Sequence, residues 1–288
     1  MTRSSPPFSM PASAHPGRIG LRVGSVDRLR PVYEDVLGLD VDHNGDTAVL
    51  SAGETPLVVL DEDATAPERP RDAAGLFHLA IRVPTRAALG DVLTRLDGSG
   101  VSLTGASDHL VSEALYLRDP EGNGVEVYRD RPREAWTATG ERGDRVEMDT
   151  LPLDLDDLRA AATGASADAL PSGTDLGHVH LEVSSLEASK AFYVDRLGLN
   201  TRNESYQGAL FVAAGDYHHH VGVNTWNRRQ SPGGSSRGVK WFEFVVPVEA
   251  VTALREALEG AGAAVDRVGD TLRLTDPDGI EVRVRPTS

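Results

Sequence analysis

The clearest pattern of apolar and polar positions lies in the second half of the chain. Residues 178–183 read His-Val-His-Leu-Glu-Val, so they predict a strand with one apolar face and one face of ligand-type side chains. Residues 186–197 then carry apolar side chains at helical spacing, and Gly198 ends the predicted helix. Because this helix would cover the apolar face, His178, His180 and Glu182 are expected to point into the space that the sheet encloses. This arrangement favours metal or substrate chemistry over a solvent-exposed polar face.

The same strand-helix pattern occurs four times. Residues 32–39 (VYEDVLGL) return as residues 192–199 (FYVDRLGL), which indicates an internal duplication. Further strand-helix units open at residues 75–84 and 238–247, and each half ends with an Asp-Pro turn between two apolar strands. The chain is therefore predicted to be an α+β protein of four βαβββ modules, with two modules in each half.

Segments without this pattern suggest the domain boundaries. Residues 1–16 are rich in Ser, Pro and Ala and are expected to form a flexible arm. Modules one and two would form a first domain over 17–130, and modules three and four a second domain over 176–286. The charged segment between them, 131–175, is interpreted as an interdomain connection with one short helix at 154–162.

Composition excludes several functions. The 288 residues carry a formal charge of −15, which argues against a surface for nucleic acids or anionic membranes. The chain has no cysteine, so disulfides and thiolate metal sites are excluded. Since there is also no apolar run of membrane-spanning length and no signal-peptide core, we expect a cytoplasmic protein, either a monomer or a homodimer.

Three motifs, together with the repeat, carry a resemblance to a known family. They are residues 177–181 (GHVHL), 217–226 (YHHHVGVNTW) and 112–126 (SEALYLRDPEGNGVE). The chain resembles the vicinal-oxygen-chelate (VOC) superfamily, which includes glyoxalase I, bleomycin-resistance proteins and extradiol dioxygenases. It is most similar to two-domain bacterial catechol-2,3-dioxygenase-like proteins. The resemblance implies two domains, each a curved mixed sheet with helices on the outside.

The resemblance also implies one divalent metal between two modules, held by residues of the first and last strand of each. Matched to this chain, those positions are His78 and Glu126 in module two and His178 and His220 in module three. Imidazoles with a carboxylate suit Fe(II), with Mn(II), Ni(II) or Zn(II) as alternatives. This site requires modules two and three to pair across the two halves of the chain.

A second arrangement pairs the modules within each half, as in better-known extradiol enzymes. Its ligands would be His178, His220 and Glu281, and Trp241 would stand where those enzymes place a histidine. We favour the pairing across the halves because it leaves no ligand position vacant.

The resemblance implies an extradiol dioxygenase that opens a small aromatic substrate, a catechol, with O2. His218 and His220 are expected to share the cavity face as acid–base groups, because period two would send His219 toward the helices. Tyr116 is expected to hydrogen-bond the substrate. The alternatives are a metal-dependent isomerase like glyoxalase I and a metal-free binder of the bleomycin-resistance type.

Overall fold

The computed structural model describes residues 8–166, 168–263 and 265–287. The first two modules contain β1 (His15–Val23), α1 (Val26–Pro31), the π-helical turn η1 (Val32–Val36), β2 (Asp40–Asn44), β3 (Thr47–Ala52), β4 (Thr55–Glu62), β5 (Gly75–Arg82), α2 (Arg86–Ser99), β6 (Gly105–Asp108), β7 (Ser112–Arg118) and β8 (Gly124–Asp130). The connection contains η2 (Arg133–Ala135), β9 (Ala138–Thr139), β10 (Arg145–Val146), β11 (Leu151–Pro152) and α3 (Leu155–Ala160).

The second half repeats this order. Its elements are β12 (Asp175–Glu182), α4 (Leu186–Lys190), the π-helical turn η3 (Ala191–Arg196), β13 (Asn200–Asn203), β14 (Ala209–Ala213), β15 (Val221–Asn224), β16 (Gly238–Val246), α5 (Val248–Gly260), β17 (Asp266–Val268), β18 (Thr271–Thr275) and β19 (Glu281–Pro286). The prediction of four βαβββ modules in an α+β fold is confirmed.

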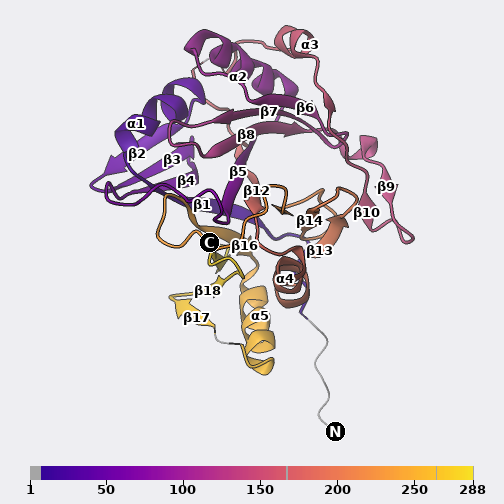
Figure 1. The fold of residues 1–288 in the computed structure, drawn as a ribbon. Coiled ribbons are helices and arrows are strands. Elements are labelled where there is room, and N and C mark those ends of the chain that lie inside the picture. The colour runs from indigo at the N-terminus through magenta and orange to yellow at the C-terminus, as the bar shows by residue number, and fades with distance from the viewer. Residues whose placement is uncertain (1–7, 167, 264, 288) are drawn as a thin grey trace.

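The modules pair across the two halves of the chain. Modules two and three form a nine-stranded sheet, in the order β11-β6-β7-β8-β5-β12-β15-β14-β13. Modules one and four form an eight-stranded sheet, in the order β17-β18-β19-β16-β1-β4-β3-β2. In both sheets the first strands of the two modules run antiparallel, β5 against β12 and β1 against β16 (Figure 1). This is the pairing that we favoured from the sequence, because it leaves no ligand position vacant.

Hydrogen bonds tie together the two modules within each half. The hydroxyl of Tyr33 in η1 donates to Asp119 over 3.1 Å, and that of Tyr193 in η3 donates to Asp276 over 2.9 Å. Each aspartate begins the Asp-Pro turn of the following module, and both tyrosine side chains are fully buried. The duplication is thus preserved in the packing of the helices as well as in the strands.

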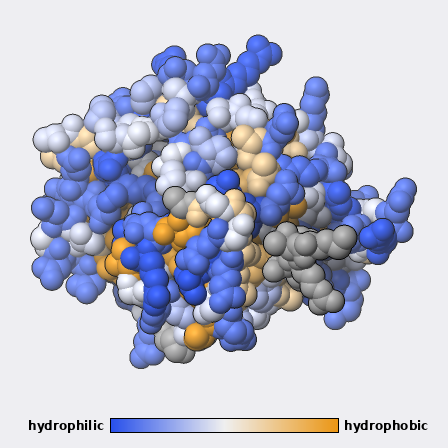
Figure 2. All heavy atoms as spheres, turned by 90° about the horizontal axis from the view of Figure 1, so that it is seen from below, coloured by the Kyte–Doolittle hydropathy of each residue, from blue (hydrophilic) through white to orange (hydrophobic). Residues whose placement is uncertain are grey.

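One continuous apolar core lies between the sheets and their helices. Its members come from both sheets, including Leu21 of β1, Leu181 of β12 and Phe242 of β16. The polar face of β12 is turned away from this core. On the outside, the face seen from below is mostly hydrophilic, as the net charge of −15 leads one to expect (Figure 2).

The segments outside the modules are more ordered than the sequence suggests. In the predicted arm, residues 1–7 lie outside the described residues, but Met10 is buried and its N–H donates to Gly198 O over 2.9 Å. In the predicted connection, α3 confirms the short helix, and β11 adds a strand to the edge of the nine-stranded sheet. A two-residue strand is too short to show a period, so its sequence carried no signal.

Two predicted strands differ from the structure. The sequence of module two also predicts a strand near Val101, after the helix; that strand is absent, and β6 begins at Gly105 instead. The strand expected over residues 218–224 begins only at Val221, so the three preceding histidines do not follow the alternation of a strand. Within the described ranges, no helix is long and apolar enough to cross a membrane.

Candidate metal centre

The register of three neighbouring strands brings two histidines and a glutamate together. Ala80 of β5 lies opposite His178 of β12 on one side and Glu126 of β8 on the other. Because the methyl group of Ala80 is small, the two longer side chains can meet above it. His78 lies two residues before Ala80, on the same face of β5, and completes the group.

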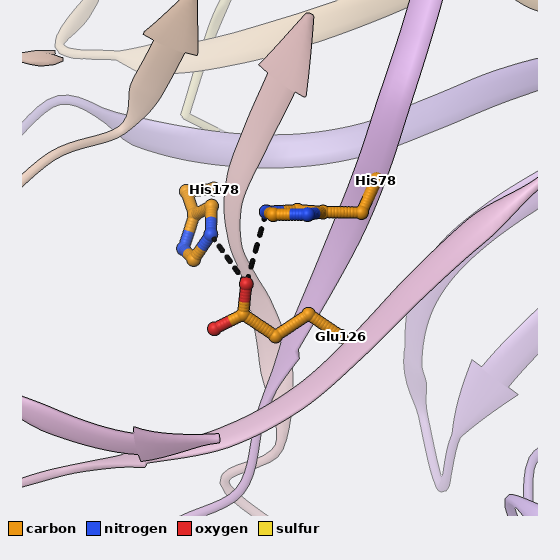
Figure 3. Close-up of side chains that lie close together, drawn as sticks. All are labelled: His78, Glu126 and His178. Carbon is orange, nitrogen blue, oxygen red and sulfur yellow. Dashed lines mark hydrogen bonds and ion pairs between the residues drawn. The ribbon is translucent and has the colours of Figure 1, made fainter. Parts of the chain in front are cut away.

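These three side chains converge on one oxygen atom. Glu126 Oε2 lies 2.9 Å from His78 Nε2 and 3.2 Å from His178 Nε2 (Figure 3). The three potential ligand atoms all lie within 4.8 Å of one another, and all three residues are buried. Among the described residues, His78 Nε2 and His178 Nδ1 find no partner for a well-directed hydrogen bond, which leaves buried nitrogen atoms unsatisfied.

The charge states of the cluster also suit a cation. Burial lowers the pKa of His178 to about 4, so this imidazole is neutral near pH 7. Burial opposes ionisation of Glu126, but His178 and His78 outweigh it and hold the pKa of the carboxyl well below its usual range. Two imidazoles and one carboxylate form the donor set of many divalent-metal sites, so these residues fit a divalent metal.

The run His218–His220 is arranged differently from the prediction. His219 lines the cavity, and its ring centroid lies 4.1 Å from that of His178. His218 is fully buried behind it, with Nε2 3.0 Å from Asp130 Oδ1. The prediction extended the alternation of a strand to residues 218–220, which precede β15. It therefore placed His218 and His220 on the cavity face, whereas His219 is the one that lines the cavity.

His220 lies outside the cluster of ligand atoms. Its Nδ1 accepts a hydrogen bond from the N–H of Ala214 over 3.1 Å, and its ring stacks on Tyr217. The other nearby ring is that of Phe244, which belongs to the apolar core. We therefore leave His220 out of the ligand set that we propose below.

Tyr116 lies opposite Glu126 in the pairing of β7 with β8 and lines the cavity. Its hydroxyl lies 2.7 Å from His109 Nε2, and His109 Nδ1 lies 2.7 Å from Asp149 O. Since a carbonyl oxygen only accepts, His109 carries its proton on Nδ1 and accepts from Tyr116 through Nε2. Burial and the charge of Glu126 raise the pKa of Tyr116 well above its usual value, so the phenol stays protonated.

His180 lies beside the cluster of three and lines the same cavity. Its Nε2 lies 3.1 Å from Asn224 Nδ2, and its ring contacts those of Phe77 and Trp226, which also contact each other. The ring also rests on Gly222, where an added Cβ would come within 3.1 Å of it. His180, which the strand pattern placed on the cavity face, does lie there, without belonging to the group of three.

A cavity of about 410 Å³ opens above the cluster. One wall consists of the aromatic side chains of Phe77, Phe211 and Trp226, and the connection contributes Met148 and Thr150. Trp226 is 46% exposed but fixed at its indole, where Nε1 donates to Gln207 O over 2.9 Å. Trp226, Met148 and Thr150 lie outside regular strands, so the strand pattern gave no signal for these three residues.

A network of polar side chains surrounds Arg82, at the end of β5. Arg82 donates to both Asp175 and Asp130, and the hydroxyl of Tyr217 also donates to Asp130. Tyr128 Oη lies 2.8 Å from Tyr217 Oη and packs where Gly177 leaves room, since a Cβ there would lie 1.8 Å away. The strand pattern of residues 75–84 alone predicts Arg82 to be a solvated strand residue, but its long side chain reaches carboxylates that this pattern does not place nearby.

The alternative ligand Glu281 lies in the other sheet. It faces Trp241 in the pairing of β16 with β19, and its carboxylate binds Arg283 over 2.5 Å. The residues His178 and Glu281, which the pairing within each half would bring together, therefore lie in different sheets.

Fold and site together define a class of protein: paired βαβββ modules whose curved sheet presents a buried cluster of two histidines and one carboxylate. Residues 15–127 and 175–284 match the model of the Glyoxalase/Bleomycin resistance protein/Dioxygenase superfamily. The chain belongs to this superfamily, as its motifs led us to expect.

Two relatives of this chain are named as dioxygenases. The chain is 38% identical over 276 residues to the Bacillus subtilis (strain 168) protein named catechol-2,3-dioxygenase, covering 93% of this chain and 96% of that one. A shorter match, 39% identical over 64 residues, covers 22% of this chain and 34% of biphenyl-2,3-diol 1,2-dioxygenase 3 of Rhodococcus globerulus.

Solved structures support the fold. A Bacillus subtilis protein provisionally described as a dioxygenase superimposes with a TM-score of 0.64 at 16% identity, over 98% of this chain and 86% of that one. Glyoxalase I from Zea mays superimposes with a TM-score of 0.56 at 17% identity, over 94% of this chain and 92% of that one. Both similarities extend over nearly the whole chain.

Proposed function

We propose that this protein is an extradiol dioxygenase that cleaves the ring of a catechol-type substrate with O2. The observation that carries the proposal is the convergence of the buried residues His78, His178 and Glu126 at the floor of a cavity with one aromatic wall. The similarity over almost the full chain to a protein named catechol-2,3-dioxygenase supports the same reaction class.

The proposed cofactor is Fe(II), held by His78, His178 and Glu126. Two histidines with one carboxylate are the ligand set of non-haem iron oxygenases, in which the remaining positions stay open for substrate and oxygen. When bound, the metal would lower the pKa of a catechol hydroxyl and hold both reactants side by side. Mn(II) is an alternative that the same ligands accept.

His219 is proposed as the acid–base group in place of His218 and His220. Its ring lines the cavity beside His178, and burial with the charges of neighbouring histidines holds its pKa well below the ordinary value. A neutral imidazole beside the substrate can accept a hydroxyl proton and return it at a later step.

Tyr116 is proposed to orient the substrate. Because its own proton is donated to His109, the lone pairs of the phenol oxygen remain free to accept a hydrogen bond from a hydroxyl in the cavity. Its place opposite Glu126 sets that oxygen next to the proposed metal ligands. The aromatic wall formed by Phe77, Phe211 and Trp226 would then pack against the substrate ring.

The rival function is a glyoxalase-like isomerisation. A fourth protein ligand, His220, would favour this isomerase. In the structure, His220 accepts a hydrogen bond from the N–H of Ala214. Three protein ligands leave more open positions, as a reaction that joins substrate and O2 on one metal requires.

Oxygen uptake tests the proposal directly. Protein loaded anaerobically with Fe(II) should consume O2 on addition of catechol and develop the yellow absorbance of a ring-opened semialdehyde. Turnover of a glutathione hemithioacetal without oxygen uptake would support the isomerase instead. The variant His78→Ala provides the control, because it retains the cavity but lacks one proposed ligand.

A further inference from the structure

The eight-stranded sheet repeats the metal site with different side chains. Residues 17–24 of module one align with residues 177–184 of module three, so Arg18 and Arg22 occupy the positions of His178 and Glu182. Trp241 of β16 likewise stands where β5 carries His78. This second sheet therefore lacks both histidines of the metal cluster, and arginines stand at two of the matching positions of its first strand.

A cavity of about 240 Å³ lies at this counterpart position. Its lining contains two carboxylates, Asp278 and Glu281, and five cationic side chains: Arg22, Arg69, Arg237, Lys240 and Arg283. In a chain with a formal charge of −15, such a local excess of positive charge calls for a physical explanation.

The two carboxylates in the lining are already engaged. Asp278 accepts from the N–H of Ser184 over 3.1 Å, at the start of the turn before α4. Glu281 binds Arg283 over 2.5 Å, and Arg283 also stacks on the ring of Trp241. Lys240 pairs with Asp61, so two of the five cations are neutralised locally.

Arg22 and Arg237 have weaker partners. Arg22 reaches only the carbonyl oxygens of Gly234 and Ser236, over 3.4 and 3.3 Å, and makes no ion pair within the described ranges. The carboxylate that Arg237 approaches, Glu121, is 3.8 Å away. Both oxygens of Glu121 already accept backbone N–H groups at the start of α1.

Arg69 completes the group from the loop before β5. One arm of its guanidinium donates to Glu182 over 2.8 Å, a carboxylate that also binds Arg229. The other arm, Nη1, is buried and has no hydrogen-bond partner among the described residues. It lies against Gly75, where an added Cβ would come within 2.5 Å of Nη1.

We propose that this second cavity binds a small oxyanion, the phosphate or carboxylate group of a small molecule, between Arg22, Arg69 and Arg237. Guanidinium groups present paired N–H donors that match two oxygens of such a group. Each of the three has N–H groups without a hydrogen-bond partner in the described part of the chain, although Arg237 Nε donates to Ala66 O over 3.0 Å. The site is separate from the proposed metal centre, because the two cavities have no lining residue in common.

Calorimetric titration of the full-length protein with inorganic phosphate tests this site. We expect saturable binding of one phosphate per chain, above any effect of sodium chloride at the same ionic strength. The double substitution Arg22→Gln/Arg237→Gln should weaken it about tenfold or more, since charge-assisted hydrogen bonds are lost. Acetate in a parallel titration separates the two ligand classes: binding of both anions indicates a general oxyanion site, and binding of phosphate alone indicates a phosphate-bearing ligand.

The matched control is Arg255→Gln/Arg267→Gln, which removes the same charge from arginines that pair with exposed carboxylates on the surface. Should the first double variant fail to fold, Arg22→Gln alone carries the test, because Arg22 makes no ion pair with any described residue. Absence of saturable phosphate binding would overturn the proposal. Binding that survives the cavity substitutions would also overturn it, by placing the anion elsewhere, such as on a bound metal.

Discussion

His218 and His219 face each other through their Nδ1 atoms, which lie 2.8 Å apart. Because the carboxylate of Asp130 only accepts, His218 carries its proton on Nε2 and its Nδ1 accepts from His219. His219 is then protonated on Nδ1, and its Nε2 keeps the lone pair. Asp130 thus determines, through His218, which nitrogen of the cavity histidine can take up a proton.

Replacing His219 should remove most of the turnover and leave the metal in place. General acid–base catalysis contributes about 10²–10⁴-fold to rates, so His219→Gln should lower kcat by a factor in that range. Metal content measured beside kcat separates this effect from loss of the site.

The matched variant is His220→Gln, in the next residue of the same run. Its ring contacts Tyr217 and the core, so kcat should stay within a few-fold of the unmodified protein. A large loss of kcat in His220→Gln together with normal turnover in His219→Gln would reverse our assignment.

Tyr116→Phe keeps the ring and removes the hydroxyl that contacts His109. One lost hydrogen bond to a substrate group amounts to about 1 kcal/mol or more, so kcat/KM for catechol should fall roughly tenfold. Unchanged metal content is expected, because Tyr116 is not among the three clustered ligands. If kcat/KM stays the same, Tyr116 is only a packing residue.

Asp276 should make folding stability depend on pH. Burial raises its pKa to about 6. Since the folded state then holds the proton more tightly than the unfolded chain does, its contribution to stability is present below pH 4 and is lost as the pH rises through 6. The shift corresponds to about 3 kcal/mol.

Urea unfolding at pH 4.5 and pH 7 measures this effect in Asp276→Asn against the unmodified protein. The free energy of unfolding of the unmodified protein, minus that of Asp276→Asn, should be larger at pH 4.5 than at pH 7. Asp270→Asn is the control, because that aspartate is exposed and pairs only with Arg267. A difference that does not change with pH would contradict the raised pKa.

The repeat made the fold predictable from the sequence. The period of two in residues 178–183 placed His178 on the cavity face, whereas His78 and Glu126 were matched to ligand positions through the resemblance to the family. The pairing of modules could be inferred only indirectly, from which arrangement filled all the ligand positions.

The remaining parts of the site depend on irregular backbone. His218 and His220 were misplaced because β15 begins at Val221, and the preceding residues have no strand period. Thr150, which lines the cavity, comes from a segment that resembled a plain connection. The contacts of Arg82 join three segments through a long flexible side chain, and no local pattern predicts such a reach.

The metal content of three single-residue variants tests the central claim most directly. After reconstitution with Fe(II) and removal of excess metal, His78→Ala and Glu126→Ala should each lose bound iron, because each removes one of three converging ligands. Glu281→Ala should retain the iron content of the unmodified protein, since Glu281 is paired with Arg283 in the other sheet. All three variants must first show cooperative unfolding. Loss of iron in Glu281→Ala with normal iron in His78→Ala would contradict a metal centre built by modules two and three.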